Sequence, residues 1–159
     1  QVLEVLQESI NSLNAFRSSE GSILLKEFEL RIRNIEELLH QVEALDATRM
    51  DGVKLRLRKA VENLQTTVDE YRFEQELIYY LEKFDITEEK VRLGNHLHYF
   101  LETLHLPDSN GKKLGFISQE IGREINTIGS KANHSETQQL VVQMKDELEK
   151  IKEQLLNVL

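Results

Sequence analysis

The chain has 159 residues, of which 40% are apolar and 30% charged, and its single proline and seven glycines favour one all-α unit over strands. Cysteine is absent, which excludes disulfides and thiolate metal sites, and no run reaches the roughly 18 apolar residues of a membrane span, so we expect a cytoplasmic protein without a membrane partner. The net charge of -8 repels nucleic acid unless positive side chains cluster locally.

The first part of the chain carries two apolar stripes. The first stripe begins at Val2 and predicts a helix that ends near Phe16, where the sequence SSEG at residues 18–21 offers a break. The second runs from Leu24 to about Ala47 and predicts a long helix that stops before a turn at residues 51–52. We expect residues 1–69 to form a helical hairpin or arm. Because the chain opens in mid-pattern, we also expect it to be a piece of a larger protein.

A basic run follows the expected turn. Residues 53–58 alternate in hydrophobicity like a strand, but Ala60, Val61 and Leu64 restore a helical period, which favours a helix. The run contains four cations, Lys54, Arg56, Arg58 and Lys59. They could contact phosphate or simply solvate a helix face, and the solvated face is the more common case.

Residues 70–159 form the second predicted region. A short helix is expected over residues 71–84, and Asp85 or Thr87 should cap a further helix that ends near Leu104. Proline and glycine mark a loop at residues 106–111. A long helix over residues 112–158 should follow, with an interruption near residues 133–135 where Ser135 can cap the continuation. The loop should make the helices on its two sides antiparallel, so we expect long helical hairpins in an elongated bundle.

Three glycines recur at heptad spacing inside that last helix. Gly115, Gly122 and Gly129 each cost about 1 kcal/mol relative to alanine. A glycine stripe lets another backbone, of a helix or of RNA, approach closely. We prefer the interpretation as a helix-packing seam to that as an RNA contact.

Two segments carry a family resemblance. The segment DITEEKVRLGNHL at residues 85–97 resembles the D-I-S-E-E-x-x-R-L-x-x-H block of the bacterial YicC/YloC endoribonucleases. From residue 111, GKKLGF, then QE, RE and NTIGSKA, resemble that family's G-R-R-L-D-F…Q-E…R-E-x-N-T-x-x-S-K-A core. The chain departs from this pattern at Lys112-Lys113, Gly115 and His134. The similarity is specific from about residue 74 to 157, and we expect the family's N-terminal region, which the resemblance implies to include β structure, to lie outside this sequence.

The resemblance implies an activity and an assembly. It implies an endoribonuclease that depends on Mn2+ or Mg2+ and binds RNA in a cavity of a homo-oligomer, with a hexamer as the assembly that the resemblance implies. It implies no nucleotide cofactor, and the sequence contains no P-loop, Rossmann glycine pattern, HExxH motif or nucleophilic triad.

The spacing of polar residues is compatible with phosphodiester chemistry. Glu120, Glu124, Thr127 and Lys131 follow at steps of four, three and four, which places them on one helix face. Carboxylates one helical turn apart can hold a hard divalent ion, while arginine and lysine bind phosphate. An internal ion-pair network that holds helices together would show the same spacing.

A second face is expected to meet the first. Glu89, Arg92 and His96 share a face, and they should converge on the helix of Glu120 if the two helices pack antiparallel. His96 is then a metal ligand or a general acid/base. The candidates are catalytic Glu120, Glu124 and His96; RNA-binding Arg92, Arg123, Asn126, Lys131 and Lys112; and metal-binding Glu89, Glu120 and Glu124.

Two functions remain open from the sequence. The first is a metal-dependent endoribonuclease that cleaves single-stranded or structured RNA. The alternative is a non-catalytic helical module for oligomerisation and RNA clamping, which the acidic net charge and the glycine seam favour.

Overall fold

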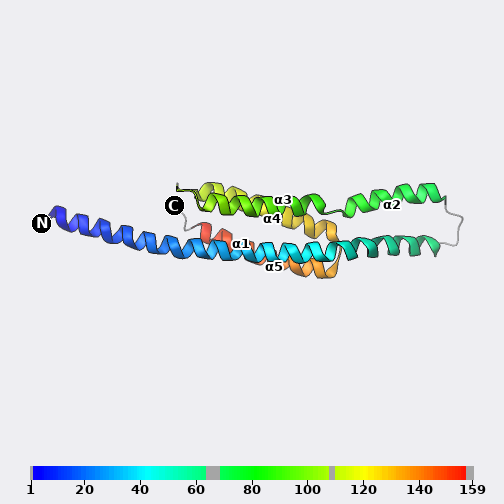
Figure 1. Cartoon of the computed structure of the whole chain (residues 1–159), viewed down its shortest axis with the longest axis horizontal. Coiled ribbons are helices and arrows are strands. Elements are labelled where there is room, and N and C mark those ends of the chain that lie inside the picture. The colour runs from blue at the N-terminus through cyan, green and yellow to red at the C-terminus, as the bar shows by residue number, and fades with distance from the viewer. Residues whose placement is uncertain (1, 64–68, 108–109, 157–159) are drawn as a thin grey trace.

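The protein is an elongated arrangement of helices (Figure 1). A computed structural model describes residues 2–63, 69–107 and 110–156, and this part of the chain contains no strand. The helices are α1 (Val2–Glu62), α2 (Glu70–Phe84), α3 (Thr87–Leu104), α4 (Gly111–Ala132) and α5 (Ser135–Leu155). The predicted all-α class is therefore confirmed. The end of the predicted last helix, at residue 158, lies outside the described residues.

Helix α1 is one continuous helix of 61 residues, so the predicted break near Phe16 and the predicted turn at Asp51 and Gly52 are wrong. The glycines in both segments adopt ordinary helical backbone angles, since no glycine in the described residues has a positive φ. An exposed glycine costs a helix about 1 kcal/mol, which is too little to stop a helix whose middle is held in a core. The alternating residues 53–58 are helical, as predicted.

The core lies between the middle of α1 and the helices α3, α4 and α5. Figure 1 shows these three helices at the level of the central part of α1, where α3 and α5 pack against α1 and α4 packs against α3 and α5. The buried apolar side chains repeat at helical spacing on each element, as the apolar stripes predicted. They include Phe28, Ile32, Ile35 and Val42 of α1, Leu93, Leu97 and Phe100 of α3, Ile121, Ile125 and Ile128 of α4, and Met144, Leu148 and Ile151 of α5.

Local capping explains where the helices of the C-terminal region begin and end. The N-cap position of α3 is Ile86, which forms no side-chain cap bond, and not Asp85 or Thr87 as predicted; Asp85, one residue earlier, accepts a hydrogen bond from the Thr87 backbone N–H at 2.9 Å. Asn133 takes the left-handed conformation at φ 39°, which ends α4 at the predicted interruption. The cap of α5 is His134, whose Nδ1 accepts from the Thr137 N–H at 3.4 Å, and Ser135 is the first residue of the helix.

Two of the three heptad glycines form the predicted packing seam between α4 and α5. A Cβ at Gly129 would lie 3.0 Å from a Val141 methyl group, and a Cβ at Gly122 would lie 3.1 Å from a Leu148 methyl group. A Cβ at Gly115 would meet nothing within 4 Å in the described residues. Gly115 therefore does not belong to this seam.

A buried ion-pair network, called here the Arg49 network and formed by Asp46, Arg49 and Lys90, joins α1 to the other helices. The Arg49 guanidinium donates to Asp46 at 2.7 and 2.9 Å, and the Lys90 ammonium donates to the same carboxylate at 2.6 Å. Arg49 also donates to the carbonyls of Ala132 and Phe84, at 3.0 and 2.8 Å. One side chain of α1 thus donates hydrogen bonds to the last carbonyls of both α4 and α2. These carbonyls need such donors, because the last carbonyls of a helix have no partner within the helix.

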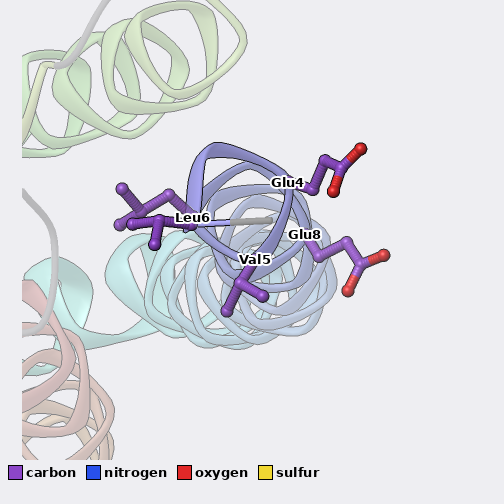
Figure 2. A pocket seen from close by; sticks show the side chains of 5 residues that line it. Glu4, Val5, Leu6 and Glu8 are labelled. Atoms are coloured by element: carbon purple, nitrogen blue, oxygen red, sulfur yellow. The ribbon is translucent and has the colours of Figure 1, made fainter.

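Both ends of α1 extend beyond this core (Figure 1). The last part of α1 pairs with α2 as a two-helix hairpin. The first 22 described residues are exposed, including Leu3, Leu6 and Ile10. In Figure 2, Glu4 and Glu8 point away from Leu6, so this end of α1 is amphipathic, and its apolar side chains are exposed in the part of the chain that the structure describes.

None of the helices in the described residues is long and apolar enough to span a membrane.

The first prediction tests the glycine seam. Gly115→Ala should raise the free energy of unfolding by up to about 1 kcal/mol, because alanine favours the helix and has room. Gly129→Ala should be at least about 1 kcal/mol less stable than Gly115→Ala, because its methyl group must displace Val141. Urea denaturation of both variants measures this difference. Equal stabilisation by the two substitutions would show that Gly129 does not set the α4–α5 distance.

The second prediction tests the Arg49 network. Arg49→Met should lower the free energy of unfolding by about 3–5 kcal/mol, because it leaves Asp46 with one partner and two buried carbonyls with none. The matched control is Arg33→Met, which removes an exposed ion pair with Glu29 and should cost less than about 1 kcal/mol. Thermal and urea unfolding provide the measurement. Similar losses in the two variants would contradict a role of Arg49 in holding the helices together.

Candidate functional site

The candidate site lies where α3 and α4 face one another. The two helices pack side by side on either side of the loop, as the sequence predicted (Figure 1). Their facing positions bring together His96 of α3 with Glu120 and Glu124 of α4. Each of these residues offers one ligand atom, and the three atoms lie within 4.8 Å of one another. These are the three residues that the sequence put forward as catalytic.

The three side chains differ in burial. Glu124 is almost fully buried, with 6% of its side chain exposed, whereas Glu120 is about half exposed. His96 is intermediate. A buried carboxylate normally has close hydrogen-bond partners, because removing a charge from water is costly. The ion pair of Glu124 with Arg92 Nη1 is long, at 4.0 Å, so this carboxylate is only weakly neutralised.

Two arginines border the carboxylates. Arg92 lies between Glu124 and Glu88, which accepts a hydrogen bond from the other end of its guanidinium. Arg123 is 75% exposed and lies 3.8 Å from Glu120. Both guanidinium groups are accessible at the rim of the cluster. Asn126 is exposed one turn further along α4.

Glu89 and Lys131 lie further along the same pair of helices. The Lys131 ammonium donates to Glu89 Oε1 at 2.6 Å, and the other Glu89 oxygen is buried without a hydrogen-bond partner. The structure therefore places Glu89, predicted as a metal ligand, in an ion pair outside the group formed by His96, Glu120 and Glu124. Lys131 also contributes to the environment of Asp85. The hydrogen bond from Thr87 lowers the pKa of Asp85, and the charges of Lys90 and Lys131 add to this effect.

Lys112 occupies the opposite end of α4. It is exposed in the first turn, eight residues before Glu120, which is about 12 Å along the helix axis. With Asn110, Lys113 and Phe116 it lines a shallow surface pocket. The structure thus does not bring Lys112 to the cluster of His96 and the two glutamates.

The sequence analysis missed two features of this region. Glu88, which holds Arg92, is an exposed acid four residues before it, a spacing that marks a helical ion pair. Asp46 and Arg49 continue the buried stripe of α1 at steps of four and three after Val42. Two opposite charges at positions that face the core could have predicted the buried Arg49 network from the sequence.

The geometry is suitable for a divalent cation. Ligand atoms about 2.1 Å from an ion are separated by about 3–4 Å from each other, so a group within 4.8 Å needs only small side-chain shifts to close on one. An imidazole and two carboxylates leave further coordination positions for water or a phosphate oxygen. The weakly neutralised charge of Glu124 supports the same reading, because a buried carboxylate gains most from a cation.

Comparison with known proteins identifies the family. Residues 42–159 match the family described as "Endoribonuclease YicC-like, C-terminal". A relative from Clostridioides difficile (strain 630), called "Probable endoribonuclease YicC", is 33% identical over 158 residues, which cover 98% of this chain and 54% of the relative. A protein of the same name from Haemophilus influenzae is 28% identical over 157 residues, 99% of this chain and 55% of that protein.

The chain spans about half the length of these two relatives. The matched region contains α2 to α5 and the last third of α1, and therefore the whole candidate site. On this evidence the chain belongs to the family of YicC-like endoribonucleases.

Proposed function

We propose that this protein is an endoribonuclease that uses a divalent metal, Mn2+ or Mg2+, at His96, Glu120 and Glu124. The observation that carries the proposal is the convergence of an imidazole and two carboxylates from different helices, next to two arginines. The names of the relatives support the reaction class. The proposal includes three further points: which residues cleave RNA, which metal is bound, and which RNA is cleaved.

The roles of the residues follow from their exposure. Arg92 and Arg123, at the rim, bind the phosphate that is to be cleaved and offset the charge that develops on it. Glu120, about half exposed, accepts the proton of the attacking hydroxyl, and the leaving oxygen takes its proton from solvent water, while His96 serves as a metal ligand rather than as a proton donor. A bound divalent ion would supply Lewis-acid stabilisation of the phosphate and lower the pKa of a water molecule. Glu124, Glu120 and His96 would hold it.

The remaining candidates are assigned to RNA binding. Asn126 and Lys131 continue the face of α4 beyond Glu124, and Lys112 lies at the start of the same helix. An RNA strand that follows α4 would meet these three residues in turn. We further propose that the protein acts as a homo-oligomer, a hexamer being the assembly that the sequence resemblance implied.

Assembly without catalysis by this chain is the second candidate. The exposed apolar side chains at the start of α1 favour it, because an isolated monomer rarely exposes so many along one helix. In that case the charged cluster between α3 and α4 would serve only to pack the helices.

The third prediction concerns the metal. The whole protein should cleave single-stranded RNA in Mn2+ or Mg2+ and should stop when EDTA is added, because the phosphate then loses its Lewis acid. Calorimetric titration with Mn2+ should detect a site that His96→Ala weakens by at least about tenfold. The control is His98→Ala, whose exposed side chain pairs with Glu102 and is outside the cluster. Cleavage that persists in EDTA would refute the metal role.

The fourth prediction separates cleavage from binding. Glu124→Gln should abolish cleavage and preserve RNA binding, because it removes a charge and keeps the shape. Arg123→Ala should weaken binding and reduce its salt slope by about 0.7, as the loss of one phosphate contact on a single strand requires. Gel assays of cleavage and fluorescence anisotropy measure the two effects.

Controls decide between the two candidate functions. Glu102→Gln removes an exposed acid of α3 and should change neither property. If Glu124→Gln and Arg123→Ala both fold and cleave like the unsubstituted protein, the site assignment is wrong. Light scattering measures how much of each variant is assembled. If both variants assemble less, but the fraction that does assemble binds and cleaves RNA normally, the packing role is favoured instead.

A further inference from the structure

The hairpin formed by the end of α1 and by α2 carries positive and aromatic side chains on one of its sides. On α2, Arg72, Glu76, Tyr79 and Lys83 follow at steps of three or four, and Tyr80 lies four residues after Glu76, so that one flank of the helix carries all five. On α1, Arg56 and Lys59 are likewise three residues apart. None of these residues belongs to the candidate catalytic site.

The hairpin has a groove between α1 and α2, and its lining shows that the side of α1 with Arg56 and the side of α2 with Arg72 both face away from it. That groove is lined by Arg58 and Glu62 of α1 and by Glu70 and Glu74 of α2, with apolar residues between them. Residues two positions apart on a helix point about 200° from each other. Arg56 therefore points away from the groove of Arg58, and Arg72 points away from the groove of Glu70 and Glu74. We call this other side the basic flank, formed by Arg56, Lys59, Arg72, Tyr79, Tyr80 and Lys83.

The cations of the basic flank are available to a ligand. All four are exposed, and among the described residues no carboxylate forms an ion pair with any of them. Glu76 is the acid that lies among them on α2. This is a local excess of positive charge in a chain whose net charge is -8. Elsewhere in the structure most cations are paired, as Arg31, Lys150 and Lys152 are.

The aromatic rings of the basic flank are also accessible. Tyr79 is 58% exposed and Tyr80 is 38% exposed. The Tyr79 ring meets the Tyr80 ring edge to face at a centroid distance of 5.7 Å, and Tyr80 stacks on Phe84 at 6.4 Å. A ring supported from one side loses little further freedom when a base stacks on it. Exposed aromatic rings between phosphate-binding cations are the arrangement that binds single-stranded RNA.

We propose that the basic flank of the α1–α2 hairpin is a second binding site for single-stranded RNA, in which Arg56, Lys59, Arg72 and Lys83 bind phosphates and Tyr79 and Tyr80 stack on bases. The proposal rests on the proposed function, since it gives the nuclease a site that holds its substrate outside the catalytic cluster. The hairpin projects beyond the core along the axis of α1, so a strand bound there is reachable from solvent (Figure 1).

RNA fits this surface better than a second protein chain does. A protein interface of four unpaired cations would require a strongly acidic partner and would bury their charges. Phosphates satisfy the same cations while they stay hydrated, with release of counterions as the driving force. The tyrosines then contribute through stacking, which needs no particular base sequence.

The fifth prediction tests this site. A labelled oligouridine of about 16 nucleotides is titrated in EDTA, so that binding is measured without cleavage. The double substitution Arg56→Gln and Lys59→Gln should weaken binding and reduce the salt slope by about 1.4, because two phosphate contacts are lost. Tyr79→Ala should weaken binding about tenfold with an unchanged salt slope. Glu76→Gln should tighten binding, because it removes the acid from the flank.

The matched control uses the opposite side of the same helix. Lys54→Gln and Arg58→Gln remove the same charge from the groove side and should leave the salt slope within about 0.3 of its original value. Equal effects of the two double substitutions would overturn the proposal, as would unchanged binding in the variants of the basic flank. Loss of assembly with unchanged RNA affinity would assign the flank to a second copy and would also overturn it. Circular dichroism confirms that the variants fold.

The same experiment separates this inference from the proposed function. If the protein binds RNA through the basic flank but never cleaves it with Mn2+ or Mg2+, the nuclease proposal fails and this site stands. If the protein cleaves RNA while the variants of the flank bind normally, this site fails and the nuclease proposal stands.

Discussion

The register of α3 against α4 is the constraint on which the candidate site depends. Apolar residues such as Leu97 and Ile121 direct the two helices toward the core, and the polar residues beside them are carried to the shared edge. A shift of one residue along α3 would turn its side chains by about 100° and remove His96 from Glu120 and Glu124. Burial of the core therefore sets the geometry of the chemistry.

Two ion-pair systems support this register from the end where α2 meets α3. The Arg49 network ties α1 to the carbonyls that end α2 and α4, and the Glu89–Lys131 pair links α3 to α4. The carboxylates of these systems, Asp46 and Glu89, are buried, so removing their cations would leave buried charges without partners rather than merely weaken a surface contact. Glu124 is different, because its burial is accompanied only by a long ion pair with Arg92. A purely structural role does not explain why Glu124 is buried with so distant a partner. The proposed cation would give its carboxylate a closer one.

The distribution of charge reconciles an acidic chain with the proposed RNA substrate. The net charge of -8 describes the whole surface, whereas binding depends on local clusters of unpaired cations. Many basic side chains among the described residues are neutralised by ion pairs with acids, within or between helices. On the basic flank of the hairpin the four cations are exposed and form no ion pair among the described residues, and at the rim of the candidate site Arg92 and Arg123 stay exposed although each pairs with an acid.

The sequence by itself determined the helical class, the limits of α2, α3 and α4, the interruption before α5 and the polar faces of α3 and α4. These features depend on local capping, on turn residues and on the helical period, all of which act over a few neighbouring residues. It did not determine the length of α1, because the tertiary core outweighs the weak breaking signals of Gly21 and Gly52. Nor did it determine that Glu89 pairs with Lys131 while His96 meets Glu120 and Glu124. Only the tertiary structure decided these contacts and the Arg49 network, because they join residues far apart in sequence and depend on how whole helices align.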